Sequence, residues 1–137
     1  VREFAQSEVQ KIAHEIDEHH RFPKELWQKI VDLGLPGIPF SEEVGGSGGD
    51  TLAYILAVEE LAKVCGSTAL TLAAHVSLGT YPIYKWGGEK LKRLYVPKLI
   101  AGEYMGAYGL TEPNAGSDSG GTQTTAVLKG DQYVLNG

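Results

Sequence analysis

The sequence has one cysteine, one methionine and no long apolar run. A single cysteine, Cys65, excludes an internal disulfide framework and fits a reducing compartment. No apolar stretch approaches the roughly 20 residues that a membrane-spanning helix needs. Basic residues are a minority, since 12 Lys and Arg stand against 17 Asp and Glu, for a formal net charge of −5. Without a basic stripe, this charge argues against nucleic acid or an anionic membrane as a partner.

The four histidines do not form a metal-binding pattern. His19 and His20 are neighbours, so on a helix their side chains point roughly 100° apart. His14 together with His19 or His20 lacks a further cysteine or carboxylate at a matching ligand spacing, and we expect no metal site. His75 lies in an apolar helical segment, where a hydrogen-bonded core histidine is the commoner case, with a pocket-lining role as the alternative. Cys65 lacks a positive neighbour, so we expect a buried structural thiol rather than a nucleophile.

The length of 137 residues allows one domain with a core, or one domain and part of another. The sequence begins at Val1 and enters helical periodicity at once, and it stops at YVLNG, within what reads as a sheet. We interpret it as a fragment of a longer protein.

Helical periodicity dominates the first hundred residues. Residues 1–21 carry apolar side chains close to i, i+3, i+4 spacing, and FPKELWQKIVDLG predicts a second amphipathic helix that ends at a left-handed Gly34. The GGSGG loop that follows matches neither of the phosphate-binding patterns G-x-x-x-x-G-K-[ST] and G-x-G-x-x-G, so we interpret it as a connecting loop. Residues 51–65 are apolar nearly all round, which predicts a central, buried helix closed by Gly66.

Two prolines punctuate the helices that follow. Pro82 predicts a new helix start after STALTLAAHVSLG, and Pro97 should end or kink the helix within GGEKLKRLYVPKLIAGE. The period then changes, since YMGAYGL predicts a buried strand and TQTTAVLKGDQYVLNG a β-hairpin turning at Gly130 and Asp131. We expect a mainly α protein, with an N-terminal helical domain at residues 1–106 and a truncated β-domain beginning at 107.

The stretch YGLTEPNAGSDSGGTQTTA, residues 108–126, lies between these regions. A spacer, a phosphate cradle and a catalytic turn are the candidate interpretations. Pro113 makes the stretch rigid and favours an extended residue before it. Asn114 and Gly116 tolerate positive φ, so the backbone N–H groups of this turn can form an anion-binding nest, to which Ser117 adds a hydroxyl. The residues suit a cofactor phosphate and a polar ring edge, without naming the ring.

YGLTEPNAGSD resembles the signature of the acyl-CoA dehydrogenases, which is close to aromatic-x-apolar-T-E-P-x-A-G-S-D. The resemblance extends through FPKELWQKIVDLGLPGIPFSEEVGGSGGD, LAVEELAKVCGSTALTLAAHVSLG and WGGEKLKRLYVPKLIAGE. It implies an N-terminal helical bundle, a β-barrel or sandwich middle domain, a C-terminal four-helix domain and a homotetramer. It also implies FAD-dependent α,β-dehydrogenation of an acyl-CoA to a trans-2-enoyl-CoA, with electrons passing to an electron-transfer flavoprotein.

The same resemblance assigns site residues. Tyr108 matches the aromatic beside the flavin, and Leu110 the residue whose backbone meets the pyrimidine edge. Thr111 matches the hydroxyl that hydrogen-bonds the ring near N5, where a donor stabilises the charge that builds as hydride arrives. Gly116 and Ser117 match the loop at the FAD pyrophosphate, and Ser117 also lies near the pantetheine arm of the substrate.

The resemblance also places the catalytic base outside this sequence. It is a glutamate beyond Gly137 in most members, and no glutamate of this chain matches it. We therefore expect residues 1–137 alone neither to bind FAD well nor to turn over substrate. Asn114 replaces a common glycine but also tolerates a left-handed turn.

Substrate and setting remain open at this level. Tyr81 would shorten the acyl pocket, which favours a short-chain substrate such as butyryl-CoA. The resemblance implies a cytoplasmic location in a bacterium or a mitochondrial matrix in a eukaryote, and we favour the bacterium. An acyl-CoA oxidase, a flavin hydroxylase and a non-catalytic helical interaction module remain as alternatives. The candidate pocket-lining residues are Ala73, Ala74, His75, Leu78 and Tyr81.

Overall fold

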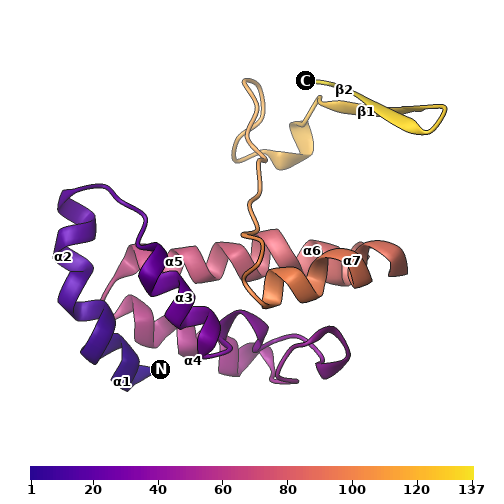
Figure 1. Cartoon of the computed structure of the whole chain (residues 1–137). Coiled ribbons are helices and arrows are strands. Elements are labelled where there is room, and N and C mark those ends of the chain that lie inside the picture. Colours follow the sequence, from indigo (N-terminus) through magenta and orange to yellow (C-terminus); the bar gives the residue numbers. More distant parts are fainter. The chain divides into compact units, whose positions relative to one another are not determined.

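The computed structural model describes all 137 residues (Figure 1). The chain is helical through most of its first hundred residues and ends in a two-stranded antiparallel sheet, which confirms the mainly α fold. It divides into two compact units, Val1–Ala107 and Tyr108–Gly137. No helix is long and apolar enough to cross a membrane.

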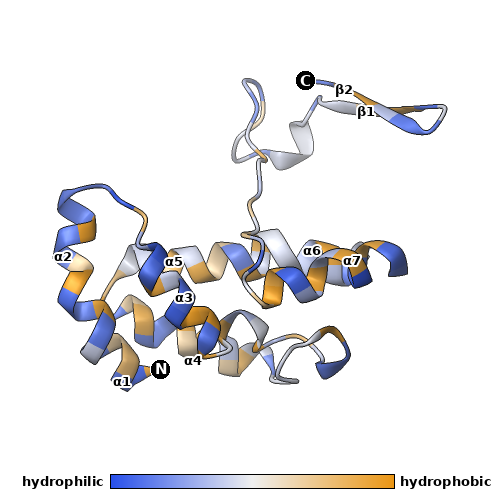
Figure 2. Cartoon of the chain, viewed as in Figure 1, coloured by the Kyte–Doolittle hydropathy of each residue, from blue (hydrophilic) through white to orange (hydrophobic).

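The first unit contains seven α-helical segments joined by short π-helical and 3₁₀ turns. Blue and orange residues alternate along α2 and α3 in Figure 2, as expected for amphipathic helices. In chain order the elements are α1 (Arg2–Phe4), η1 (Ala5–Val9), α2 (Gln10–Glu18), α3 (Lys24–Asp32), η2 (Leu35–Gly37), η3 (Glu42–Val44), α4 (Thr51–Ala62), α5 (Gly66–Ala74), η4 (His75–Thr80), α6 (Tyr81–Trp86) and α7 (Glu89–Ile100).

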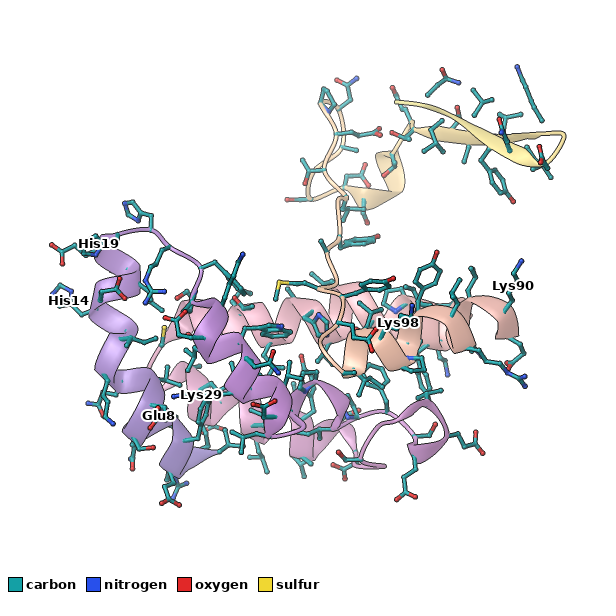
Figure 3. All side chains as sticks on the ribbon, viewed as in Figure 1. Glu8, His14, His19, Lys29, Lys90 and Lys98 are labelled. Carbon is teal, nitrogen blue, oxygen red and sulfur yellow. The ribbon has the colours of Figure 1, made fainter.

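The N-terminal helices begin and end close to where the sequence predicts. α1, η1 and α2 run on without a break, and α3 is followed by Gly34 at φ 71°, the left-handed residue expected there. A surface ion pair of 2.6 Å joins Glu8 of η1 to Lys29 of α3, both labelled in Figure 3. Both partners are solvent-exposed, so burial of the apolar faces contributes more to this packing than the pair does.

Helix α4 departs from its expected central position. The Asp50 side chain caps it by accepting a 2.7 Å hydrogen bond from the N–H of Ala53. The helix ends at Ala62, and Gly66 begins α5 instead of closing α4, so that expectation is wrong. One face packs in the core, but the other is exposed, because nothing in this unit covers it. The large apolar residues of α4 that are exposed are Leu52, Ile55 and Leu56.

From Gly66 to Trp86 the chain stays helical through α5, the π-helical η4 and α6. Pro82 lies in the first turn of α6, as expected, but it does not interrupt the helical path. Pro97 lies inside α7, which continues to Ile100, so it does not end the helix. The Tyr54 hydroxyl donates to the Ala73 carbonyl at 3.2 Å and joins α4 to α5.

A single hydrophobic core holds the first unit together. Phe40, Leu61, Leu72 and Val96 are fully buried within it, although they lie far apart in the sequence. The whole cluster of buried side chains comprises Ala5, Val9, Ile16, Leu26, Trp27, Ile30, Leu35, Phe40, Tyr54, Leu61, Cys65, Ala69, Leu72, Val76, Val96 and Ile100.

The second unit is a loop followed by the predicted hairpin. After the 3₁₀ turn η5 (Ser119–Gly121), β1 (Thr125–Lys129) pairs with β2 (Gln132–Asn136) in antiparallel register. Gly130 has φ 65° in the turn, a conformation that glycine adopts without strain. Every residue of both strands is exposed.

The strand expected at residues 104–110 does not form, so that prediction is wrong. Its large side chains are exposed, among them Met105 at 46% and Leu110 at 41%. A strand is stable only when a neighbouring strand pairs its backbone N–H and C=O groups. No segment of the chain pairs with residues 104–110.

Candidate functional site

The TEPNAG motif folds into a tight turn within the second unit. The N–H of Glu112 donates to the Ala115 carbonyl at 3.0 Å, and the N–H of Ala115 donates back at 3.1 Å. Pro113 and Asn114 form the tip of this turn. Ala115 is 3% exposed and is the one buried residue of the unit. The motif is therefore an ordered turn, which excludes a flexible spacer.

The carboxylate of Glu112 fastens the turn to the start of β1. It accepts hydrogen bonds from the Thr124 hydroxyl, from the N–H of Gln123 and, at 3.1 Å, from the N–H of Thr124. The hydrogen bonds from the Thr124 hydroxyl and the Gln123 N–H lower the pKa of Glu112, because they stabilise its charged form. The role of Glu112 is thus to brace the loop.

Sequence reasoning missed this role and assigned Glu112 to the loop without a task. A signal was present, since Glu112 is followed 11 and 12 positions later by two polar residues, Gln123 and Thr124. That signal is weak, because only folding brings the two segments together.

The residues assigned to the cofactor by resemblance are all exposed. Tyr108 is 55% and Leu110 41% exposed. Thr111, Gly116 and Ser117 are also exposed, which leaves their polar groups accessible to a ligand.

The expected left-handed nest is absent, so that part of the prediction is wrong. Neither Asn114 nor Gly116 has positive φ, because the pair of hydrogen bonds between Glu112 and Ala115 closes the turn without it. A Cβ added to Gly116 would meet nothing within 4 Å. The chain itself therefore does not require glycine at position 116, and the space beside it is open.

His75, the first residue of η4, is a core residue. It is 1% exposed, and the edge of its ring faces Trp27 with the ring centroids 5.0 Å apart. The Gly106 N–H donates to Nδ1 at 2.9 Å, so Nδ1 is unprotonated and Nε2 carries the proton that it donates to the Leu99 carbonyl at 3.0 Å. Burial lowers the pKa of His75 and keeps the ring neutral. The expectation of a hydrogen-bonded core histidine is therefore confirmed, and the alternative of a pocket-lining role is wrong.

The other histidines lie on the surface near α2. The Nδ1 of His14 lies 3.8 Å from the Oε2 of Glu18, and the Nδ1 of His19 lies 3.0 Å from the Glu15 carbonyl oxygen. Both histidines are labelled in Figure 3. The structure has no group of three or more His, Cys, Asp or Glu side chains placed to hold a metal ion. Cys65 is 8% exposed and accepts a hydrogen bond from Thr68, so it is buried near a helix end, as predicted.

A cavity of about 250 Å³ opens in the first unit between the α2–α3 connection and α5. It is not lined by the expected acyl-pocket residues. Tyr81 is 38% exposed and lies near Tyr84 and Trp86, with ring centroids 6.3 and 6.1 Å away. The lining residues of the cavity are Ile16, His20, Arg21, Phe22, Pro23, Leu26, Trp27, Ile30, Ser67, Thr68 and Thr71.

Comparison with known proteins identifies the chain's relatives. Residues 1–103 match the family model described as "Acyl-CoA dehydrogenase, N-terminal domain". A short-chain specific acyl-CoA dehydrogenase of Clostridium acetobutylicum is 59% identical over all 137 residues, which span 36% of that protein. The chain thus spans just over a third of the length of this curated relative.

Solved structures agree over nearly the whole chain. The butyryl-CoA dehydrogenase of Megasphaera elsdenii is 44% identical with a TM-score of 0.90, covering 99% of this chain and 37% of that one. An acyl-CoA dehydrogenase of Bacillus anthracis, solved in complex with FAD, is 39% identical with a TM-score of 0.88, covering 99% and 24% respectively.

Proposed function

Because the chain belongs to the acyl-CoA dehydrogenase family, we propose that the protein carrying it dehydrogenates an acyl-CoA thioester at the α and β carbons with FAD. The flavin would accept the hydride from the β carbon. The product is a trans-2-enoyl-CoA, and an electron-transfer flavoprotein receives the electrons. A homotetramer and a bacterial cytoplasmic location belong to the same proposal, the location supported by the bacterial relatives.

The observation that carries this proposal is the exposed Thr111 hydroxyl beside the braced Glu112. Three hydrogen bonds hold the Glu112 carboxylate, so the backbone next to Thr111 is fixed while its side chain stays accessible. A donor aimed at the flavin ring stabilises charge best when it does not have to reorganise. Thr111 would donate to the ring, and the Leu110 backbone and Tyr108 would border it.

The turn after Ala115 is proposed to hold the FAD pyrophosphate. Gly116 and Ser117 are exposed, and the open space beside Gly116 leaves room for a phosphate to approach the backbone. Ser117 would also reach the pantetheine arm of the substrate.

A short acyl chain, such as butyryl, is the proposed substrate. This is supported by the short-chain specific relative and by the butyryl-CoA dehydrogenase structure. Tyr81 would limit the depth of the acyl pocket. As the family resemblance implies, the general base would be a glutamate outside residues 1–137, and Glu112 instead braces the loop.

The test uses the protein at its natural length, with Thr111→Val and Thr111→Ser as a matched pair. Valine keeps the shape of threonine but removes the donor, whereas serine keeps the donor. We expect Thr111→Val to lower kcat for butyryl-CoA about 100-fold, and Thr111→Ser to lower it by less than tenfold. Absorbance of the flavin and turnover with an electron-transfer flavoprotein are the measurements.

Several results would contradict the proposal. Wild-type protein purified without flavin would contradict the use of FAD. A clear preference for octanoyl-CoA would contradict the proposal of a short-chain substrate. Rapid oxygen consumption without an electron-transfer partner would indicate an oxidase. Equal activity of the valine and serine variants would remove the role of Thr111.

A further inference from the structure

Two glycines bring distant backbone segments into direct contact in the first unit. A Cβ atom added to Gly79 of η4 would lie 2.6 Å from the Cα of Gly106, and one added to Gly106 would lie 2.8 Å from the Cα of Gly79. Real Cβ atoms do not approach that closely, so each position requires glycine. The contact lies in a π-helical turn, a form that is frequent at functional sites.

The ring of His75 spans the same crossing. Its Nε2 donates to the carbonyl of Leu99, and its Nδ1 accepts from the N–H of Gly106. One side chain thus holds both ends of the segment that leads out of α7. Thr80 lies in the same turn, but its buried hydroxyl donates to the backbone carbonyl of His75 at 2.8 Å and not to the ring.

We propose that His75 is a positioning residue for the flavin loop. By holding Gly106 against Gly79, it fixes the point from which the chain enters Tyr108–Thr111. This inference rests on the proposed function. Tyr108 is two residues beyond Gly106, no more than about 7 Å of extended chain, so a displaced Gly106 shifts the start of the loop. Displacements of about 1 Å are enough to impair positioned groups in an active site.

Two amide side chains separate the two hydrogen bonds of His75. The oxygen of asparagine lies near the place of Nδ1, so His75→Asn keeps an acceptor for Gly106 and loses the donor to Leu99. The amide nitrogen of glutamine lies near the place of Nε2, so His75→Gln keeps the donor to Leu99 and loses the acceptor for Gly106. A purely structural role would make the two variants equivalent.

The control variant is Thr80→Val. It removes a buried hydrogen bond of the same turn but leaves the bond between His75 and Gly106 in place. It therefore reports the effect of lost stability alone on cofactor binding.

The experiment compares these variants of the natural-length protein by FAD dissociation constant, flavin absorption spectrum, melting temperature and hydrogen exchange of the Gly106 amide. We expect His75→Gln to weaken FAD binding about tenfold, to shift the spectrum and to speed exchange at Gly106, since it leaves that N–H unpaired. His75→Asn and Thr80→Val should stay within about threefold of the wild-type FAD affinity, with melting temperatures lowered as much as in His75→Gln.

The outcomes separate this inference from the proposed function. Wild-type protein without flavin would contradict both the proposed function and the positioning role of His75. A wild-type flavoprotein in which His75→Gln and His75→Asn bind FAD equally well would remove the positioning role alone. Thr80→Val weakening FAD as much as His75→Gln would also overturn it, because lost stability would then account for the effect.

Discussion

Residues 1–107 and 108–137 are held in shape by different forces. The first unit buries 16 side chains in a cluster drawn from most of its helices, whereas the second buries only Ala115. The hairpin nevertheless has a defined register, with Thr125 opposite Asn136 and Lys129 opposite Gln132. Its order comes from backbone pairing and a favourable turn, and such hairpins are marginally stable without a packed face. Burial thus determines the first unit, and local hydrogen bonding the second.

The largest expected effect on stability comes from replacing a buried leucine of the first unit, compared with an exposed leucine of the second. Leu72→Ala should destabilise the chain by about 2–5 kcal/mol, because Leu72 is 0% exposed and its loss leaves a cavity. Leu135→Ala in β2 should change stability by less than about 0.5 kcal/mol, because Leu135 is 69% exposed. Urea denaturation followed by the amide NMR signals of each unit measures both, and similar losses in the two variants would refute the comparison.

A second effect contrasts two glycines of the first unit. Gly79→Ala should destabilise by about 1–3 kcal/mol, because its Cβ would meet the Gly106 backbone. Gly66→Ala should be neutral or slightly stabilising, because a Cβ there meets nothing within 4 Å and alanine restricts the unfolded chain. Thermal denaturation of the two variants is the measurement, and equal melting temperatures would show that the crossing yields easily.

The smallest effect concerns the braced loop of the second unit and depends on pH. The pKa of Glu112 in the folded chain is lowered from its usual 4.5. The stability that its carboxylate contributes is therefore complete above about pH 4.5 and is lost as the pH falls through the lowered pKa. The amide signals of Gln123 and Thr124 should therefore shift in an acid NMR titration. Glu112→Gln should abolish this titration, while Glu103→Gln should leave it unchanged. An unaltered titration in Glu112→Gln would assign it to another group.

Much of the helical unit was predictable, because periodicity is a local property. Gly34 was correctly expected at a helix end, since a left-handed glycine acts within a few residues. The burial of α4 was overestimated, because an apolar pattern does not report whether a partner covers each face. The expected strand at 104–110 failed for the same reason, since strand formation depends on a distant pairing segment.

The candidate site divides in a similar way. The motif placed Thr111, Gly116 and Ser117 in an exposed loop through resemblance, which needs no coordinates. The left-handed nest at Asn114 was wrong, because tolerance of positive φ does not require it. The hydrogen-bond partners of Glu112 and His75 could not be predicted from the sequence, because each partner is 11 or more residues away.

By itself the sequence determined the amphipathic helices, the hairpin turn at Gly130 and the family to which the loop motif belongs, since these depend on neighbouring residues or on a contiguous motif. Only the tertiary structure decided which face of α4 is buried, that Glu112 braces the loop and that His75 joins Leu99 to Gly106. The last two features depend on backbone groups with no sequence signature of their own. A side chain can recognise them only after the fold has brought them within hydrogen-bonding distance.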